Sequence, residues 1–458
     1  MNDITAFFAF LKYCLGYKEN MSKIVAGMGW QELYSFASKQ ALLGLCFEGI
    51  ERLGKEYPEE LRLNPIGREL LMTWMGKAQQ IRRQNMKVNV MAGKLFAMLR
   101  VDGMRCCILK GQGNALMYPN PYSRTPGDID VWIDASRERI MEYTQKKFEL
   151  GDDIRLQHLE TSLDGVPVEL HFFPCSMNNP IYHARLQKWF RRYADLQCSH
   201  IVGLPDGAGD IAIPTTAFNV VYQLTHLYHH FFDEGIGMRQ IIDYFLVVND
   251  FSKNVFLDNK SSKITPSLFT LKEGSTAFPK PLSPQGTGDV TAPSRCSEPL
   301  RSKDGGPSKV SPDCAGWDRR GVSGDIASDA SVISAFTTDS SASTALVVVQ
   351  RELKYLGLWK FAGAVMYVLK EVLGLSEDKM IVPMDEKRGR LLLAEILNGG
   401  NFGKHFTKYA GFTHQSMGKK YFLKIWRNMH FVRYYPAEAL CEPLFRTWHF
   451  FWRMKNKK

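Results

Sequence analysis

Residues 108–134, ILKGQGNALMYPNPYSRTPGDIDVWID, constrain the fold of this chain more than any other stretch. An apolar run at Cys106–Leu109 predicts a short buried strand, which leads into a Lys-Gly turn, a helical piece and a Pro-rich loop. A second apolar strand follows and carries Asp128 and Asp130. Because side chains alternate along a strand, both carboxylates are expected to point to one side of it and the intervening apolar residues to the other.

The two aspartates are candidate metal ligands. Carboxylates held side by side repel one another unless a cation lies between them, and Mg²⁺ or Mn²⁺ prefers such oxygen ligands. The alternative for Asp128 and Asp130 is an ordinary solvated strand end. Two neighbouring features favour the metal: Gly127 allows the backbone to approach a ligand, and Lys110 with Gly111 offers a cation and an N–H group to a phosphate.

A β-hairpin is predicted further along the chain. The Asp-Gly pair at 164–165 is a strong hairpin turn signal, and it would pair residues 157–163 with 166–173. In the second arm Glu169 and His171 share one face, and apolar residues share the other. Glu169 is therefore the third candidate ligand. His171 is either a member of the site or an ordinary strand residue.

The order of these parts resembles the active site of the DNA polymerase β-like nucleotidyltransferases. The pattern LKG…YP.P..R..GDID.W, followed by VELHF, is similar to a bacterial branch of uncharacterised nucleotidyltransferases, whose members often lie among polysaccharide-biosynthesis genes. The resemblance is specific over roughly residues 108–173 and weaker through most of the remaining chain outside one insert. One feature departs from the superfamily pattern, because Gly111 is followed by Gln112 in place of the usual Ser.

The resemblance implies a mixed α/β (α+β) nucleotidyltransferase-like fold and an enzyme that transfers a nucleotidyl group from ATP or another NTP to an acceptor hydroxyl, with Mg²⁺ or Mn²⁺ as cofactor. Asp128, Asp130 and Glu169 would hold the metal, and Glu169 would also assist deprotonation of the acceptor. A non-catalytic nucleotide- or partner-binding module on the same fold, or a γ-phosphotransferase, is the alternative. The groups expected at the phosphates are Lys110, Gly111, Arg124 and Gly127.

A helical segment from about residue 215 to 250 contains two further groups of interest. His226 and His230 lie one turn apart, the spacing that two ligands of one metal need, but the row HLYHH lacks the acid of a zinc-protease HExxH motif. Arg239 is a candidate phosphate contact, with Asp243 one turn later as its expected i+4 partner. A purely structural ion pair is the alternative for these two residues.

Composition limits the class of protein and its partners. Lys and Arg number 58 against 47 Asp and Glu, and the resulting net charge of +11 favours anionic partners. The nine cysteines include no C-x-x-C pair, which argues against a disulfide framework or a zinc site and fits the reducing cytoplasm. The N-terminus lacks the basic start of a signal peptide. The sequence contains no run of 18 apolar residues, so no membrane-spanning helix is expected.

Five regions are expected along the chain. They are an N-terminal helical region (1–100), the nucleotidyltransferase-like core (101–200), a helical region packed on the core (201–251), a disordered insertion (252–344) and a C-terminal helical region (345–458). The insertion is predicted because Ser, Pro, Gly and Thr replace any periodic apolar pattern there. Within the core, Ser136 is a plausible N-cap of a helix at Arg137–Lys147.

The tail of the C-terminal region, residues 419–458, interleaves aromatic and basic residues. Its aromatic side chains would either pack on the catalytic domain, or lie on an anionic membrane surface or a nucleic acid. Of the two binding alternatives, the composition favours peripheral contact with an anionic membrane.

Overall fold

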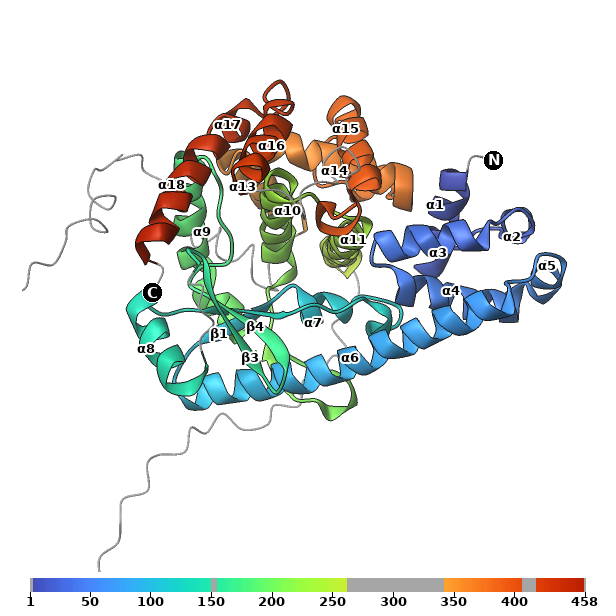
Figure 1. The fold of residues 1–458 in the computed structure, drawn as a ribbon, viewed down its shortest axis with the longest axis horizontal. Coiled ribbons are helices and arrows are strands. Elements are labelled where there is room, and N and C mark those ends of the chain that lie inside the picture. The colour runs from blue at the N-terminus through green and yellow to red at the C-terminus, as the bar shows by residue number, and fades with distance from the viewer. Residues whose placement is uncertain (1–2, 150–154, 262–341, 406–416, 457–458) are drawn as a thin grey trace, which may run out of the picture. The chain divides into compact units, whose positions relative to one another are not determined.

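The computed structural model describes residues 3–149, 155–261, 342–405 and 417–456 (Figure 1). The chain divides into two compact units, Met1–Lys260 with Ala330–Lys458 and, separately, Ser261–Asp329. Apart from Ser261, the second unit lies outside the described residues. The elements and contacts below therefore belong to the first unit.

A four-stranded mixed sheet forms the centre of the site. Its order is β1 (Cys106–Leu109), β2 (Ile129–Ile133), β4 (Val166–His171) and β3 (His158–Leu163). Strand β2 is antiparallel to β1 and parallel to β4, and β3 is antiparallel to β4. A separate antiparallel pair consists of β5 (Ile201–Gly203) and β6 (Asp210–Ala212). The expected mixed α/β class is confirmed.

The hairpin β3–β4 follows from its turn residues. Asp164 and Gly165 both have positive φ, 48° and 74°, and Leu163 pairs directly with Val166 across this two-residue loop. Positive φ at both central positions gives a turn whose twist matches that of the strands, and Asp-Gly is among the sequences that tolerate it best. The hairpin predicted from the sequence is confirmed.

The sheet is covered on both faces. On one face the apolar side chains of β2 and β4 pack with α6 (Arg68–Val101) and α8 (Arg137–Lys147) in one core cluster. On the other, Trp132 of β2 stacks on Phe218 of α10 (Thr216–Asp233), with ring centroids 6.3 Å apart. Figure 1 shows α6 along one side of the sheet and α9 and α10 on the other. Asp130 is two residues before Trp132 and therefore faces α10.

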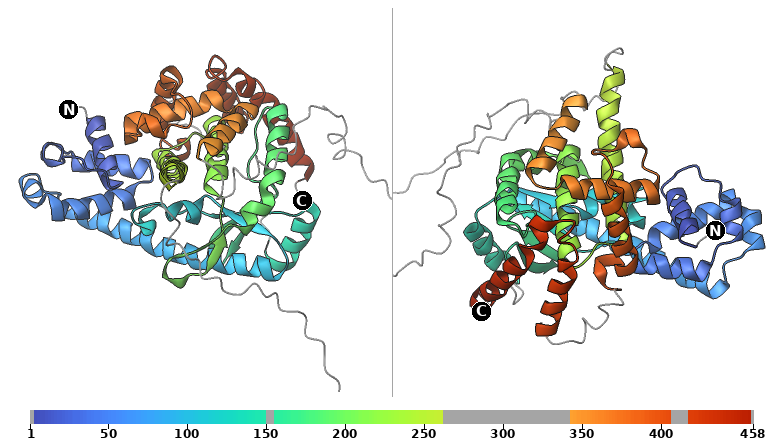
Figure 2. Two further views of the ribbon diagram at one scale, coloured as in Figure 1. Left: turned by 180° about the vertical axis from the view of Figure 1, so that it is seen from behind. Right: turned by 90° about the horizontal axis from the view of Figure 1, so that it is seen from above.

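The N-terminal helices pack around the first part of α6, whose later turns reach the sheet (Figure 2). Trp74 of α6 is fully buried there, and its indole donates to the carbonyl of Leu43. Helix α8 begins where the sequence predicted, with the Ser136 hydroxyl accepting from the backbone N–H of Arg139. The N-terminal helices are α1 (Asp3–Cys14), α2 (Ser22–Ala26), α3 (Trp30–Lys39), α4 (Leu43–Glu56) and α5 (Pro58–Leu63).

Further helices follow, and the long ones lie on the α10 side of the sheet (Figure 1). The long ones are α9 (Pro180–Ser199), α11 (Met238–Ser261), α13 (Ala342–Tyr355), α14 (Trp359–Leu373), α15 (Glu386–Gly399), α16 (Met417–Met429) and α18 (Glu442–Asn456). The short ones are α7 (Gly111–Ala115), α17 (Pro436–Ala439), η1 (Pro121–Ser123), η2 (Pro205–Gly207), η3 (Glu377–Lys379) and η4 (Asn401–Gly403).

The predicted insertion, residues 252–344, lies outside the described residues except at its ends. There the structure corrects its bounds, because α11 continues through residues 252–261 and α13 already begins at 342. Ser252 illustrates the reason: its hydroxyl donates to the carbonyls of Val248 and Lys379 and is buried between them. A tertiary contact thus holds the first residue beyond the predicted boundary in the helix.

Among the described helices, none combines the length and the apolar character that crossing a bilayer requires. The seven cysteines in the described part of the chain are free thiols. Five of them, at 14, 46, 106, 107 and 175, are buried.

Candidate active site

The register between β2 and β4 brings three carboxylates together. Asp130 and Glu169 are direct partners in the parallel pair. Asp128 was expected on the same strand, but β2 begins one residue later, and Asp128 belongs to the loop that enters it. Ligand oxygens of Asp128, Asp130 and Glu169 nevertheless all lie within 4.8 Å of one another. This spacing permits all three to coordinate one ion, or two ions that share Asp130.

Mutual repulsion among the three acids affects their pKa values. The negative charge of Asp130, together with burial and Glu169, raises the pKa of Asp128 to about 6. Burial alone would raise the pKa of Asp130 as well, but Lys110 and a hydrogen bond from His171 hold it below its ordinary value. Asp128 is therefore the carboxylate with the least cationic compensation, and a divalent cation would supply what is missing.

Lys110 enters the site from the end of β1. Its ammonium group lies 3.0 Å from Asp130 Oδ1 and 3.3 Å from Nε2 of His226 on α10. Burial opposes its charge, but the charges of Asp130, Asp128 and Glu169 outweigh burial and raise its pKa. The backbone of Lys110 has φ 55° and ψ −123°, a conformation that costs energy for a residue with a side chain. This strained turn directs the lysine into the site.

His171 holds two of the carboxylates in place. Its Nε2 lies 3.0 Å from Asp130 Oδ1 and 3.2 Å from Glu169 Oε2. The amide nitrogen of Gln157 donates to the carbonyl of Pro174 and faces Nδ1 of His171 at 3.3 Å, so Nδ1 of the neutral ring is the acceptor. Nε2 then carries the hydrogen, as it also does in the cation. His171 is thus a donor that orients Asp130 and Glu169.

His158, Glu169 and His171 form a second group with metal-ligand spacing. His158 pairs with His171 across the hairpin, and its Nδ1 lies 3.4 Å from Glu169 Oε2. Neither of its buried ring nitrogens makes a hydrogen bond within the described residues. Burial and the neighbouring His171 lower its pKa to about 4. Because the Nε2–H of His171 points at the carboxylates, this group lacks the free lone pair that a ligand needs. The three-carboxylate group is the better metal site.

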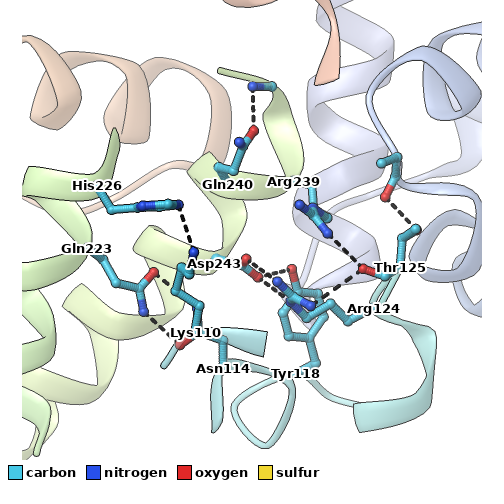
Figure 3. A network of polar contacts seen from close by, with 12 residues as sticks. Lys110, Asn114, Tyr118, Arg124, Thr125, Gln223, His226, Arg239, Gln240 and Asp243 are labelled. Atoms are coloured by element: carbon cyan, nitrogen blue, oxygen red, sulfur yellow. Dashed lines mark hydrogen bonds and ion pairs between the residues drawn. The ribbon is translucent and has the colours of Figure 1, made fainter. Parts of the chain in front are cut away.

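Arg124 lies outside this cluster, in contrast to its expected role at the phosphates. Its Nε and Nη2 donate to the two oxygens of Asp243 at 2.9 and 2.8 Å, and Tyr118 also donates to that carboxylate (Figure 3). Arg124 and Asp243 are both buried, and the ion pair raises the pKa of Arg124 against the effect of burial. A carboxylate occupies the Nε–Nη2 fork of this guanidinium, and the side chain is only 4 % exposed, so a phosphate cannot bind at that fork.

Arg239 does not form the predicted i+4 pair with Asp243. Its Nη1 donates to the carbonyl of Thr125 at 3.0 Å, on the loop that leads to the aspartates (Figure 3). Its Nε has no hydrogen-bond partner among the described residues. Burial and the nearby charge of Arg124 lower the pKa of Arg239. Asp243 thus pairs with Arg124, and Arg239 forms no ion pair within the described residues. Its positive charge beside the acids suits an anionic ligand.

The glycines and Gln112 have different roles. A Cβ at Gly127 would meet nothing within 4 Å, so the protein itself leaves open space at this position. Gly111 has φ 26° and begins α7 directly after the strained Lys110. Gln112 is buried and donates to Asn89 of α6, so this side chain fastens α7 to α6. It takes no part in the carboxylate cluster.

The histidines of α10 belong to the wall of the site. The rings of His226 and His230 are 4.3 Å apart, centroid to centroid, and burial lowers the pKa of both. Neither belongs to the clusters with metal-ligand spacing found in the described residues. His226 is a neutral contact for Lys110, and Gln223 one turn earlier exchanges two hydrogen bonds with Asn114 of α7 (Figure 3).

Sequence reasoning missed the groups that support the cluster. These groups lie far in sequence from the residues that they contact. The separation is 14 positions for Gln157 and His171, 125 for Tyr118 and Asp243, and 119 for Arg124 and Asp243. No local periodicity or sequence motif predicts contacts between residues so far apart in the chain. A buried acid in an otherwise apolar stretch of helix, as Asp243 is in IIDYFLVV, was the one available signal that an unidentified cation pairs with it.

The fold and the site define a mixed α/β protein of nucleotidyltransferase type, with a carboxylate cluster formed by two parallel strands and the loop that enters one of them. The sequence model of the family described as uncharacterised nucleotidyltransferase matches residues 26–265, and the chain belongs to this family. The match begins in α2 and so includes most of the N-terminal helices together with the sheet. No curated protein and no solved structure matches the chain.

Proposed function

We propose that the protein is a metal-dependent nucleotidyltransferase with a DNA polymerase β-like active site, built on the region from α2 to α11. The observation that carries this proposal is the proximity of the Asp128, Asp130 and Glu169 oxygens, all within 4.8 Å of one another. Oxygen donors in this number suit Mg²⁺ or Mn²⁺. When bound there, the metal would neutralise charge on the triphosphate of an NTP such as ATP.

Lys110 and Arg239 are proposed to bind the phosphates. Lys110 is only partly buried, and its ammonium already lies at the edge of the carboxylate cluster. Arg239 retains an N–H without a partner in the described residues. The backbone at Gly111 and the open space beside Gly127 complete the approach. Arg124 acts by holding the loop, since its guanidinium is bound to Asp243.

In the proposed reaction an acceptor hydroxyl oxygen attacks the α-phosphorus of the NTP. A new P–O bond forms, the bond between the α-phosphorus and the bridging oxygen to the β-phosphate breaks, and pyrophosphate leaves with that electron pair. The proton of the hydroxyl passes to Glu169, whose side chain is 22 % exposed against 7 % for Asp130. His171 keeps Glu169 and Asp130 in their relative positions through its Nε2–H.

The acceptor is proposed to be a hydroxyl compound of surface-polysaccharide biosynthesis, as the family resemblance suggests. The experiment incubates the full chain with each NTP labelled at the α- or the γ-phosphate, with Mg²⁺ or Mn²⁺, and with sugar, lipid-linked sugar, tRNA or protein acceptors. Transfer of the α label with release of pyrophosphate supports the proposal. Transfer of the γ label with release of NDP would identify a phosphotransferase instead.

A non-catalytic nucleotide-binding module is the second candidate, and one observation favours it. Asp130 already has two cationic or hydrogen-donating partners, Lys110 and His171, both at 3.0 Å. A site so compensated could hold a nucleotide without metal. Titration calorimetry of ATP with and without Mg²⁺ distinguishes the two: metal-independent binding without any label transfer would support the module.

A further inference from the structure

Helix α18 has an exposed face that is apolar and aromatic. Leu444, Trp448, Phe451 and Met454 are 73, 50, 63 and 63 % exposed. Their spacing of four, three and three residues places them along one side of the helix. A helix that only packs on its own protein turns such a stripe inward, whereas here the stripe faces outward.

The opposite side of α18, together with α17, forms polar contacts with the rest of the protein. Arg446 donates to Asp233 at the end of α10 and to Glu442 within α18. Glu438 of α17 accepts from the backbone N–H groups of Asn178 and Asn179, which lead into α9. The exposed stripe is therefore held in a defined orientation by buried and partly buried polar contacts behind it.

Helix α16, which packs against α18, repeats the pattern. Phe422, Trp426 and Met429, at positions i, i+4 and i+7, are 70, 53 and 48 % exposed. Leu440, between α17 and α18, is 53 % exposed. Many of the large exposed apolar side chains in the described residues thus lie on this C-terminal group of helices.

The same segment contains many more basic than acidic residues. Residues 417–458 contain ten Lys or Arg and only two acids, Glu438 and Glu442. Both acids are buried, each 1 % exposed, but so is Arg427 at 5 %, and Lys424 and Arg446 pair with Asp233 of α10. Apolar and aromatic side chains on an outward face, together with a strong excess of cationic residues, match the two components of an anionic lipid surface: acyl chains and negative headgroups.

We propose that α16 and α18 form a membrane-docking surface that binds anionic lipid bilayers peripherally. Leu444, Trp448 and Phe451 enter the interfacial layer. Arg433 and Lys455, basic residues of the same segment with exposed side chains, bind the headgroups. The surface is joined to the site by α10. His226 of this helix contacts Lys110, and Asp233, about 10 Å further along at ~1.5 Å per residue, pairs with Arg446. The inference goes beyond nucleotidyl transfer and does not depend on it.

Co-flotation of the full chain with vesicles tests the proposal. Vesicles of phosphatidylcholine with about 30 mol % phosphatidylglycerol are compared with pure phosphatidylcholine at about 0.15 M salt. The wild type should float with the anionic vesicles, and the variant Leu444→Gln/Trp448→Gln/Phe451→Gln should bind them about tenfold less. The matched control is Leu63→Gln/Val101→Gln, which removes two apolar side chains 83 and 87 % exposed elsewhere and should bind as the wild type does.

Control measurements distinguish loss of membrane binding from loss of folding. The substitutions are on exposed positions, so the thermal midpoint of the triple variant should match that of the control. Should the triple variant prove unstable, Trp448→Phe, which keeps an apolar ring, should retain flotation and Trp448→Gln should lose part of it. Absence of flotation of the wild type, or equal flotation of wild type and triple variant, overturns the proposal. Tight binding of a single-stranded oligonucleotide without any flotation also overturns it and assigns the surface to nucleic acid.

Discussion

Asp130 and Glu169 occupy directly paired positions on the parallel strands β2 and β4. Because the side-chain period of a strand is two, a slip of one residue would place Leu170 or Val168 opposite Asp130 and turn Glu169 to the other face of the sheet. The apolar side chains that alternate with these acids are buried against α6 and α8, which makes such a slip costly. The same packing that stabilises the sheet therefore sets the distance between the carboxylates.

Replacing Asp128 tests the role of the cluster. Asp128→Asn should lower kcat for nucleotidyl transfer by about a thousandfold, since it removes a charged ligand from the metal site. The metal-free variant should be at least as stable as the wild type, because the repulsion that raises the pKa of Asp128 to about 6 is lost. Urea denaturation in EDTA measures the stability. A variant that is both active and unstable would contradict the assignment.

His171 and His158 form a matched pair for testing how the carboxylates are oriented. They are direct partners across the hairpin, and both lie close to Glu169 Oε2, His171 at 3.2 Å and His158 at 3.4 Å. Of the two, His171 also hydrogen-bonds to Asp130, at 3.0 Å. His171→Phe should raise the metal concentration for half-maximal activity by about tenfold or more. His158→Phe, which removes a contact with Glu169 alone, should raise it much less. An equal loss for both would contradict the role assigned to the bond between His171 and Asp130.

The buried pair between Arg124 and Asp243 predicts a stability effect. Arg124→Met or Asp243→Leu alone leaves a buried charge without its partner and should cost about 3 to 5 kcal/mol of unfolding free energy. The double variant should cost less than the sum. Tyr118→Phe, which removes one hydrogen bond to the same carboxylate, should cost only about 1 kcal/mol. Denaturant titration of the four variants provides the comparison.

Arg239 should differ from Arg124 in kinetics. Arg239→Lys keeps a charge but loses the Nε–H that is available for a phosphate, and it should raise KM for NTP by about tenfold with little loss of stability. Arg124→Lys should mainly lower stability. If Arg124→Lys raised KM at unchanged stability and Arg239→Lys did neither, the phosphates would be bound by Arg124 after all.

Glu438 makes stability depend on pH. Burial raises its pKa from the usual 4.5 to about 7, although two backbone N–H groups favour the charged form. Because the folded protein binds the proton more tightly than the unfolded chain, this contribution to stability is complete below about pH 4.5. It is lost as the pH rises to about 7, by roughly 3 kcal/mol at most. Glu438→Gln should remove that slope in denaturation curves between pH 4.5 and 7.5. Glu377→Gln, at an exposed position, is the control and should retain it.

The local sequence was sufficient for the elements whose cause is local. Strand β1, helix α8 with its Ser136 cap and the Asp-Gly hairpin are where alternation, capping and turn chemistry predicted them. Each depends on residues within a few positions of one another. The same holds for the shared face of Glu169 and His171, which strand alternation alone requires.

The tertiary structure alone decided which cation pairs with which acid. Arg239 is one helical turn from Asp243, yet Asp243 binds Arg124, 119 positions away, because the loop before β2 folds back onto α11. Likewise Gln112, a candidate deviation at the phosphates, is buried against Asn89 of α6. Charges and hydrogen bonds act through space, over a few ångströms, and sequence distance carries no information on such contacts once the chain has folded.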